Sequence, residues 1–225
     1  MLSSSEAIRL LERDLIFHKS DWLKYENRWL LHCYYVGEAA YRIGKKIGLS
    51  EDKCDFLKAL GYVHDIGRKI DHSNHVIEGY NYLNKCGQSD ASFICLTHSF
   101  INCDLNLTAG LLPKGKKYKF LKTYLDAHKE SLYDNIIQLC DLFCSETGFK
   151  TIEARLLDIT KRKGAFSTSK KHLEKTFELK AKIEKYLNCN LYDLFPEIDQ
   201  ADLFNKNKDC EEIISMINSL SIENN

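Results

Sequence analysis

The sequence predicts an all-α protein. Apolar residues recur three or four positions apart along most of the chain, whereas the strict alternation of half-buried strands is hard to find. The 225 residues include only two prolines, Pro113 and Pro196, so few positions forbid a helix. Serine and glycine residues stand at several ends of the periodic segments, where helices commonly begin and end.

Five helices are expected in the first hundred residues. A serine side chain caps the free N–H groups that begin a helix, and glycine adopts the left-handed conformation that often ends one. The expected helices run from Ser3 or Ser5 to about Phe17, from about Glu26 to Ile47 before Gly48, from Ser50 to about His64, from His75 to Lys85 before Gly87, and from Ser89 to about His98.

The segment from Asn102 to Lys119 breaks this pattern. It contains Gly110, Pro113 and a basic run, KGKKYK, so we expect a loop that can act as a mobile lid. Helical periodicity resumes behind it. The later helices are expected from about Phe120, from Tyr133 to about Ser145, through Arg155 to about Lys161, from about His172 to Leu187, and once more after Pro196.

The domain organisation follows from these elements. The chain shows no internal repeat and no clear linker, and its length exceeds that of a typical single domain without reaching two. We therefore expect one domain over residues 1–225. Its core covers about 26–160, and a helical extension covers about 165–225.

The composition argues against several classes of partner. Lys and Arg together number 32, as do Asp and Glu, so neither nucleic acid nor a membrane surface is an expected partner. No stretch approaches the ~20 apolar residues of a membrane span, and the N-terminus lacks the apolar region of a signal peptide. Nine scattered cysteines without a C-x-x-C pair indicate reduced, buried thiols and a cytoplasmic location.

Four ionisable residues fall on or beside the apolar faces of four expected helices. One buried histidine is usually a hydrogen-bonded core residue, but an unpaired buried aspartate is costly. Neutral imidazoles and a carboxylate together suit a divalent metal, so a shared metal is one interpretation and separate core residues are the other. The four residues are His32, His64, His98 and Asp141.

The spacing of these residues resembles the HD superfamily of metal-dependent phosphohydrolases. His32 is followed 32 residues later by the doublet His64-Asp65 in HDIGR, and Asp141 lies on a later helix. The resemblance covers about Trp29 to Arg155. It implies an HD-domain helical bundle with additional N- and C-terminal helices.

The binuclear branches of that superfamily have two more histidines after the doublet. One opens an H-x-x-x-G helix, as His75 does in HVIEG, and the other ends a later helix before Thr or Ser, as His98 does in ICLTHSF. His72 is an alternative to His75 but lacks the glycine context. The resemblance implies one or two divalent transition metals (Fe, Mn, Zn, Co or Ni), with Asp65 as the bridge. The implied ligands are His32, His64, Asp65, His75, His98 and Asp141.

The resemblance also implies an activity. It is hydrolysis of a phosphoester or pyrophosphate bond in a nucleotide-like or small phosphorylated metabolite by a metal-activated water. Asp65 and Arg68 are the expected catalytic residues, and Arg68 and Lys69 are expected to contact substrate phosphate; a surface pair on a turn is the alternative. A dinucleoside polyphosphate hydrolase, a non-catalytic metal- or nucleotide-binding module and a diiron oxygenase are the other hypotheses. No G-Y-P motif follows the doublet, which argues against the cyclic-dinucleotide branch.

The remaining polar candidates have weaker patterns. Asp134 is either a partner of a ligand histidine or an acid that stabilises a helix N-terminus. Homo-oligomer formation stays open. Candidates for phosphate contacts are Lys114, Lys116, Lys117, Arg155, Arg162 and Lys163, and the histidines expected at the surface are His18, His128 and His172.

Overall fold

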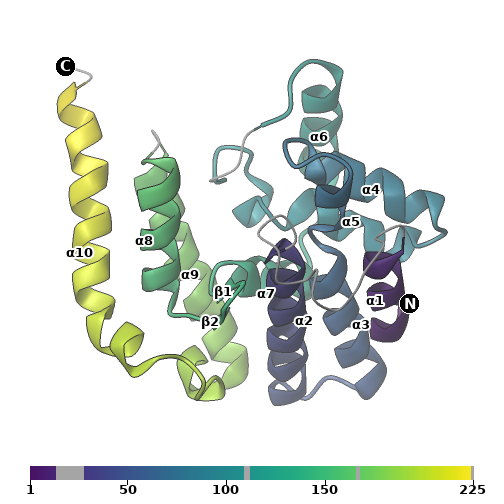
Figure 1. The fold of residues 1–225 in the computed structure, drawn as a ribbon, viewed down its shortest axis with the longest axis horizontal. Coiled ribbons are helices and arrows are strands. Elements are labelled where there is room, and N and C mark those ends of the chain that lie inside the picture. Colours follow the sequence, from purple (N-terminus) through teal and green to yellow (C-terminus); the bar gives the residue numbers. More distant parts are fainter. Residues whose placement is uncertain (14–27, 109–111, 166–167, 224–225) are drawn as a thin grey trace.

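The computed structural model describes residues 1–13, 28–108, 112–165 and 168–223 (Figure 1). It confirms the all-α class. In these ranges the only sheet is a two-stranded antiparallel pair, β1 (Cys144–Ser145) with β2 (Gly148–Phe149). None of the described helices combines the length and apolar composition that crossing a bilayer requires.

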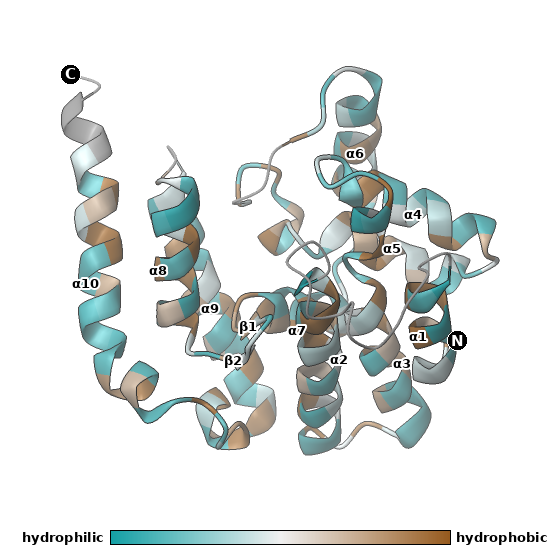
Figure 2. Ribbon diagram, viewed as in Figure 1, coloured by the Kyte–Doolittle hydropathy of each residue, from teal (hydrophilic) through white to brown (hydrophobic). Residues whose placement is uncertain are grey.

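Most helices carry hydrophobic and hydrophilic residues in turn, so that one side of the helix can pack inward (Figure 2). The α-helices are α1 (Ser4–Glu12), α2 (Arg28–Lys46), α3 (Glu51–Val63), α4 (His75–Lys85), α5 (Ser89–Thr97), α6 (Lys116–Ala127), α7 (Leu132–Asp141), α8 (Ile152–Lys163), α9 (Ser169–Leu187) and α10 (Gln200–Glu223). The short 3-10 helices are η3 (Ile66–Lys69), η4 (Ile101–Cys103) and η5 (Leu191–Leu194).

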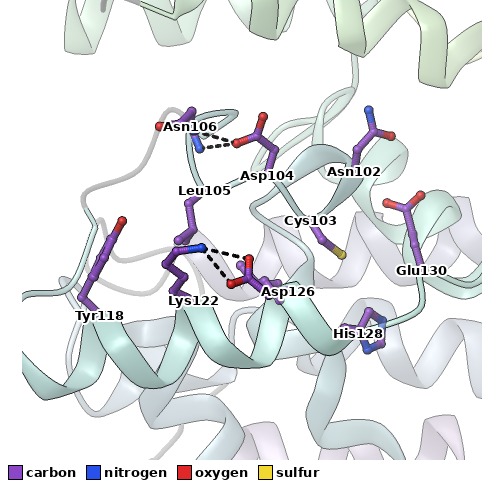
Figure 3. Close-up of a pocket in the computed structure, with 11 residues that line it drawn as sticks. Asn102, Cys103, Asp104, Leu105, Asn106, Tyr118, Lys122, Asp126, His128 and Glu130 are labelled. Atoms are coloured by element: carbon purple, nitrogen blue, oxygen red, sulfur yellow. Dashed lines mark hydrogen bonds and ion pairs between the residues drawn. The ribbon is translucent and has the colours of Figure 1, made fainter.

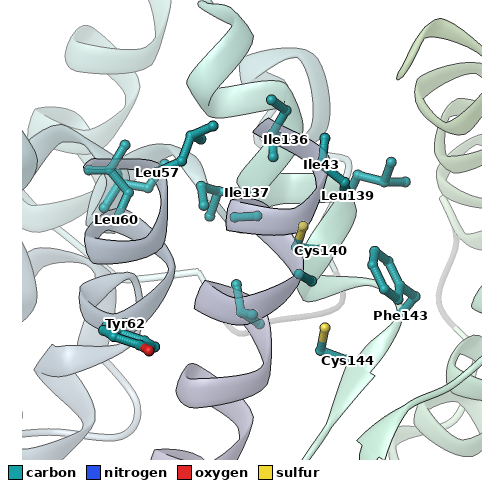
Figure 4. Close-up of a cluster of buried hydrophobic side chains, with 14 of the residues drawn as sticks. Ile43, Leu57, Leu60, Tyr62, Ile136, Ile137, Leu139, Cys140, Phe143 and Cys144 are labelled. Atoms are coloured by element: carbon teal, nitrogen blue, oxygen red, sulfur yellow. The ribbon is translucent and has the colours of Figure 1, made fainter. Parts of the chain in front are cut away.

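A central core joins α2, α3 and α7. Ile43, Leu57 and Ile137 come from these three helices and meet in one fully buried cluster (Figure 4). Burial of each such side chain contributes about 1.5–3 kcal/mol to folding. Since α2, α3 and α7 carry four of the predicted ligand positions at or near their ends, this packing holds those positions at fixed separations.

Two glycines let α2 and α3 approach closely. A Cβ atom added to Gly61 would lie 2.5 Å from the Cα atom of Gly37. No side chain fits between the backbones at this crossing. The close approach brings the C-terminal end of α3, and with it His64, against α2.

A second apolar cluster joins α4, α5 and α6. It fixes the end of α5 and the buried Phe100 that follows, with Leu121 and Leu125 supplied by α6. At the opposite side of the molecule, α10 packs against α8, and α9 packs against α7 (Figure 1).

Several predicted boundaries differ from the structure. The basic run KGKKYK is not all loop, because α6 begins at Lys116. The helix expected to reach Ser145 ends at Asp141, and the following residues form the β1–β2 hairpin. Ser89 is the first residue of α5, and Gln88 takes the N-cap position. The expected continuation of α1 to Phe17 and the expected start of α2 at Glu26 lie outside the described residues.

The cysteines match their prediction in part. All nine are free thiols, but five of them are buried and four are partly exposed. Burial raises the pKa of Cys33, Cys95 and Cys140, which keeps these thiols protonated and unreactive.

His172 corrects the prediction of a surface histidine. It lies on the buried face of α9 with 7% of its surface exposed, and burial lowers its pKa to about 4. His128 was also expected at the surface but is half-buried, and its Nε2 atom lies 3.1 Å from a carboxylate oxygen of Asp134. His18 lies outside the described residues.

The buried His172 predicts a pH-dependent stability. Its pKa of about 4 in the fold lies below the value of about 6.5 in the unfolded chain. The neutral side chain is therefore compatible with folding above pH 6.5, and its contribution is lost as the pH falls toward 4. Between pH 8 and pH 5 the wild type should lose about 2 kcal/mol more free energy of unfolding than His172→Gln. Urea denaturation of both proteins at the two pH values measures this; equal losses would contradict it.

Candidate metal centre

The six predicted ligands meet at one place in the fold. Four helices and the turn after α3 supply them, and each offers an atom within 3.4 Å of another member of the set. They are His32 on α2, His64 and Asp65 at the end of α3, His75 at the start of α4, His98 at the end of α5, and Asp141 at the end of α7.

One group of three could hold a metal ion. The Nε2 atom of His32 lies 2.9 Å from Oδ1 of Asp141 and 3.3 Å from Nε2 of His64. His64 Nε2 lies 3.8 Å from the same oxygen of Asp141. All three ligand atoms lie within 4.8 Å of one another, so a single cation can contact them together after small movements.

A second group shares His64 with the first. It contains His64, Asp65 and His98, again with ligand atoms within 4.8 Å of one another. Oδ1 of Asp65 lies 3.4 Å from Nε2 of His98 and 3.2 Å from Nε2 of His75. Asp65 therefore lies between His64 on one side and His75 and His98 on the other.

Backbone carbonyls orient three of the four histidines. Nδ1 of His64 lies 2.6 Å from the carbonyl oxygen of Gly61, and Nδ1 of His98 lies 3.1 Å from that of Ile94. Nδ1 of His75 lies 3.1 Å from the carbonyl oxygen of His72. Nδ1 donates in each pair, so Nε2 keeps its lone pair toward the centre, as in metal-binding histidines.

The charge states also suit a cation. Burial lowers the pKa of His64 and of His75 to about 4, so both imidazoles are neutral near pH 7. Burial alone would raise the pKa of Asp65, but Arg68, His75 and His64 hold it well below its usual value. The hydrogen bond and charge of His32 similarly outweigh burial and lower the pKa of Asp141. The centre thus offers ionised carboxylates at Asp65 and Asp141 and neutral imidazoles at His64 and His75.

His98 differs from its neighbours. Burial lowers its pKa, but the hydrogen bond and the charge of Asp65 raise it by more, so the net shift is upward. Its Nε2 atom also lies 2.8 Å from Oγ of Ser99. A metal at His98 has to displace that hydroxyl. Because protonation of the imidazole competes with the metal, binding here should weaken as the pH falls.

Unpartnered atoms support a missing cation. Asp65 Oδ1, His75 Nε2 and His32 Nδ1 are buried, and among the described residues they have no partner with hydrogen-bond geometry. Leaving a buried polar atom unsatisfied costs about 1–3 kcal/mol. A cation contacting Asp65 Oδ1 and His75 Nε2 would satisfy two of the three, so the residues fit a metal.

Comparison of the chain with family models, curated proteins and solved structures gave no match. The candidate centre therefore rests on its residues and their geometry.

The two predicted phosphate-binding residues point in different directions. The guanidinium of Arg68 pairs closely with Asp65 through Nε, and 31% of its side chain is exposed beside the centre. The ammonium of Lys69 instead lies 3.1 Å from the carbonyl oxygens of Leu10 and Arg13 and 2.8 Å from the hydroxyl of Tyr82. Lys69 therefore holds the end of α1, whereas Arg68 faces the candidate metals.

His72 is not at the centre. Its side chain is exposed, and it contributes its carbonyl oxygen to His75. Asp134 is no partner of a ligand histidine either. It accepts hydrogen bonds from Ser131 in a capping box at the start of α7 and lies beside His128, which supports the helix-terminal interpretation.

The weaker basic candidates are spread over the surface. Lys117 pairs with Glu78 at 2.7 Å, while Lys114 and Lys116 are exposed. Arg155 and Arg162 contact Asp158. The side chain of Lys163 is exposed, and partial desolvation and the charge of Arg68 lower its pKa.

A separate polar pocket of about 440 Å³ lies between the 102–106 segment and α6 (Figure 3). None of the six ligands lines it. Lys122 pairs with Asp126 along one wall, and Asn106 donates two hydrogen bonds to Asp104 along another. The carboxylates of Asp104 and Asp126 are thus already paired within the protein.

Two polar residues near His98 were not predicted from the sequence. Ser99 contacts its Nε2 atom, and Gln138 on α7 contacts the backbone on either side of it. A signal for Gln138 was present, because YDNIIQLCD places an amide inside an apolar stripe three residues before Asp141. Such a position needs a hydrogen-bond partner when it is buried.

Proposed function

We propose that this protein is a metal-dependent phosphohydrolase with an HD-type centre. The substrate class is a phosphoester or pyrophosphate of a nucleotide-like or small phosphorylated metabolite. One observation supports the proposal above the others: two overlapping groups of ligand atoms share His64, and Asp65 of the second group lies 3.4 Å from Nε2 of His98 and 3.2 Å from Nε2 of His75. This arrangement suits a pair of cations better than a set of separate core residues.

The protein side of the mechanism follows from the geometry. His32, His64 and Asp141 would hold one metal, His75 and His98 would hold a second, and Asp65 would contribute to both. Bound divalent transition metals supply Lewis acidity, which activates water and neutralises phosphate charge. Fe, Mn, Zn, Co and Ni all suit this donor set. The buried carboxylate of Asp65 anchors both halves of the centre, and the Arg68 guanidinium beside it can bind and orient a phosphate.

A non-catalytic metal- or nucleotide-binding module is the second candidate. The place of Arg68 is compatible with it, because a guanidinium beside the centre can bind a phosphate whether or not the compound is hydrolysed. The two candidates differ in turnover. A catalytic centre releases phosphate or a nucleotide from a panel of phosphorylated compounds, dinucleoside polyphosphates included, whereas a binding module retains the compound unchanged.

Metal content tests the centre directly. Protein purified without chelators should contain about two transition-metal ions per chain by mass spectrometry of the elements. The metal content should fall in His75→Ala and in His98→Ala. Metal-loaded protein should then hydrolyse at least one member of the panel. A chain that neither contains nor takes up metal would refute the proposal.

Arg68 provides a prediction about substrate binding. Arg68→Met removes the guanidinium while keeping most of the side-chain length. If the guanidinium binds phosphate, KM should rise about tenfold or more with metal content unchanged, since a charged hydrogen bond contributes about 1.5–3 kcal/mol. Lys69→Met is the matched control, because its ammonium lies on Leu10 and Arg13, and its KM should stay near that of the wild type. Metal loss in Arg68→Met would instead show that Arg68 holds Asp65 in place.

A further inference from the structure

Gln138 lies in the interior and connects α7, which carries Asp141, with the end of α5, where His98 stands. Its side chain is 1% exposed, and it lies on α7 between two fully buried apolar residues, Ile137 and Leu139. Three residues later the same helix carries Asp141, a ligand of the first group. Residues three apart lie on one side of a helix, so Gln138 and Asp141 face the same part of the core.

The side-chain amide of Gln138 is hydrogen-bonded to the end of α5. Its Nε2 atom donates hydrogen bonds of 3.1 Å to the carbonyl oxygen of Thr97 and 3.2 Å to that of Phe100. Those two carbonyls flank His98 and Ser99. A single side chain on α7 therefore holds the backbone on both sides of a ligand of the second group.

The backbone around His98 needs such a support. α5 ends at Thr97, and beyond Phe100 the chain turns sharply, with Asn102 and Cys103 both at a φ of 55°. Helix ends leave carbonyl groups without helical partners and fray more easily than helix interiors. His98 thus lies at an end of a helix, where its position depends on contacts from elsewhere.

The hydrogen bonds are not required to satisfy these carbonyls. The oxygen of Thr97 also accepts from the N–H of Phe100, and the oxygen of Phe100 also accepts from the N–H of Cys103. Removing the Gln138 amide would leave neither oxygen unpaired. Removing the amide should therefore shift the backbone around His98 while lowering the free energy of unfolding only slightly.

Gln138 also lowers the stability of the fold by burying an oxygen atom without a hydrogen bond to any described residue. Its Oε1 atom is buried and, within the described part of the chain, has no hydrogen-bond partner. Methionine has nearly the same length and shape and would bury no unsatisfied oxygen. For stability alone the amide is a poor choice at this position, so its two directed hydrogen bonds point to another role.

We propose that Gln138 is a positioning residue that fixes His98 relative to Asp141 and so sets the spacing between the two metal-binding groups. The proposal rests on the metal centre of the proposed function. Gln138 touches neither metal nor substrate; it acts through the backbone of residues 97–100. Outer contacts of this kind typically change metal affinity by about 10- to 100-fold.

The test compares Gln138→Met with Asn135→Leu. Asn135 lies one turn earlier on α7 and is 2% exposed, and its buried Nδ2 atom has no hydrogen-bond partner among the described residues. Its replacement therefore removes a buried amide without removing the hydrogen bonds to the end of α5. Metal affinity is measured by competition with a chromophoric chelator, metal content by elemental mass spectrometry, and the stability of the metal-free proteins by thermal unfolding.

Gln138→Met should bind its second metal at least about tenfold more weakly than the wild type, and the first metal unchanged. The metal-free variant should unfold at the same temperature as the wild type or higher. Asn135→Leu should bind both metals as the wild type does.

Two results would overturn the positioning role. One is unchanged affinity for both metals in Gln138→Met. The other is a lowered unfolding temperature of the metal-free variant with equal weakening of both metals, which is the result expected of a structural residue. A wild-type protein that binds no metal would refute the proposed function itself, so the two failures are distinguishable.

Discussion

Asp65→Asn should abolish hydrolysis and release metal from both halves of the candidate centre. The carboxylate is 2% exposed, and its Oδ1 atom lies 3.2 Å from Nε2 of His75 and 3.4 Å from Nε2 of His98. An amide of the same shape keeps the packing but removes the negative charge that a divalent metal requires. Metal content per chain should fall to below half of the wild-type value, with activity at background.

Asparagine is a better replacement than alanine here. Both replacements remove the charge that pairs with Arg68. The amide oxygen of asparagine can still accept a hydrogen bond from the guanidinium, whereas alanine would leave a hole beside it. Loss of metal could then follow from loss of the fold. The circular dichroism and unfolding temperature of the Asp65→Asn protein separate the two causes.

Asp134→Asn is the matched control for this experiment. Asp134 is a fully buried aspartate, and its carboxylate caps α7 through Ser131. Loss of such a cap typically costs about 0.5–2 kcal/mol. The control protein should thus be less stable and still contain metal. Full metal content in Asp65→Asn would show that the ligand assignment is wrong.

The sequence predicted helices best where their ends carry local signals. His75–Lys85 agrees at both bounds, because a polar break precedes it and Gly87 follows it. The start of α6 was missed, since Pro113 and Gly115 suggested a loop and the lysines that follow are in fact good helix formers. The β1–β2 hairpin has strands of two residues, too short to show a period.

The candidate centre was predictable for a different reason. Its six residues stand in a spacing pattern that resembles a known family, and the structure brings all six together. Directions of side chains were not predictable. Arg68 and Lys69 are neighbours, yet Lys69 is drawn to carbonyl groups 59 and 56 residues away in the chain. Contacts of such long range follow from tertiary packing, which no local pattern encodes.

The close contact between η3 and α4 supports the last prediction. A Cβ atom added to Gly67 would lie 2.0 Å from the carbonyl oxygen of His75 and 2.4 Å from the backbone nitrogen of Gly79. Real atoms do not approach so closely, and both obstacles are backbone atoms that cannot rotate away. Gly67→Ala must therefore push α4 away from the turn that carries Asp65 and Arg68.

This displacement should act on His75 first. His75 opens α4, and its contact with Asp65 depends on how closely α4 meets η3. We expect Gly67→Ala to lose the metal held with His75, retain the one held by His32, His64 and Asp141, and lose about 1–3 kcal/mol of stability from overpacking. Metal content and urea denaturation measure the two effects.

Gly44→Ala is the control for added bulk at a glycine in a helix interface. Its new Cβ atom would lie 3.0 Å from a methyl group of Leu57, which is a side chain that can adjust. Metal content should stay at the wild-type value in this protein. If Gly67→Ala also kept both metals, then the contact between η3 and α4 would not determine where His75 lies, and His75 would have to reach the centre by a movement of its own side chain.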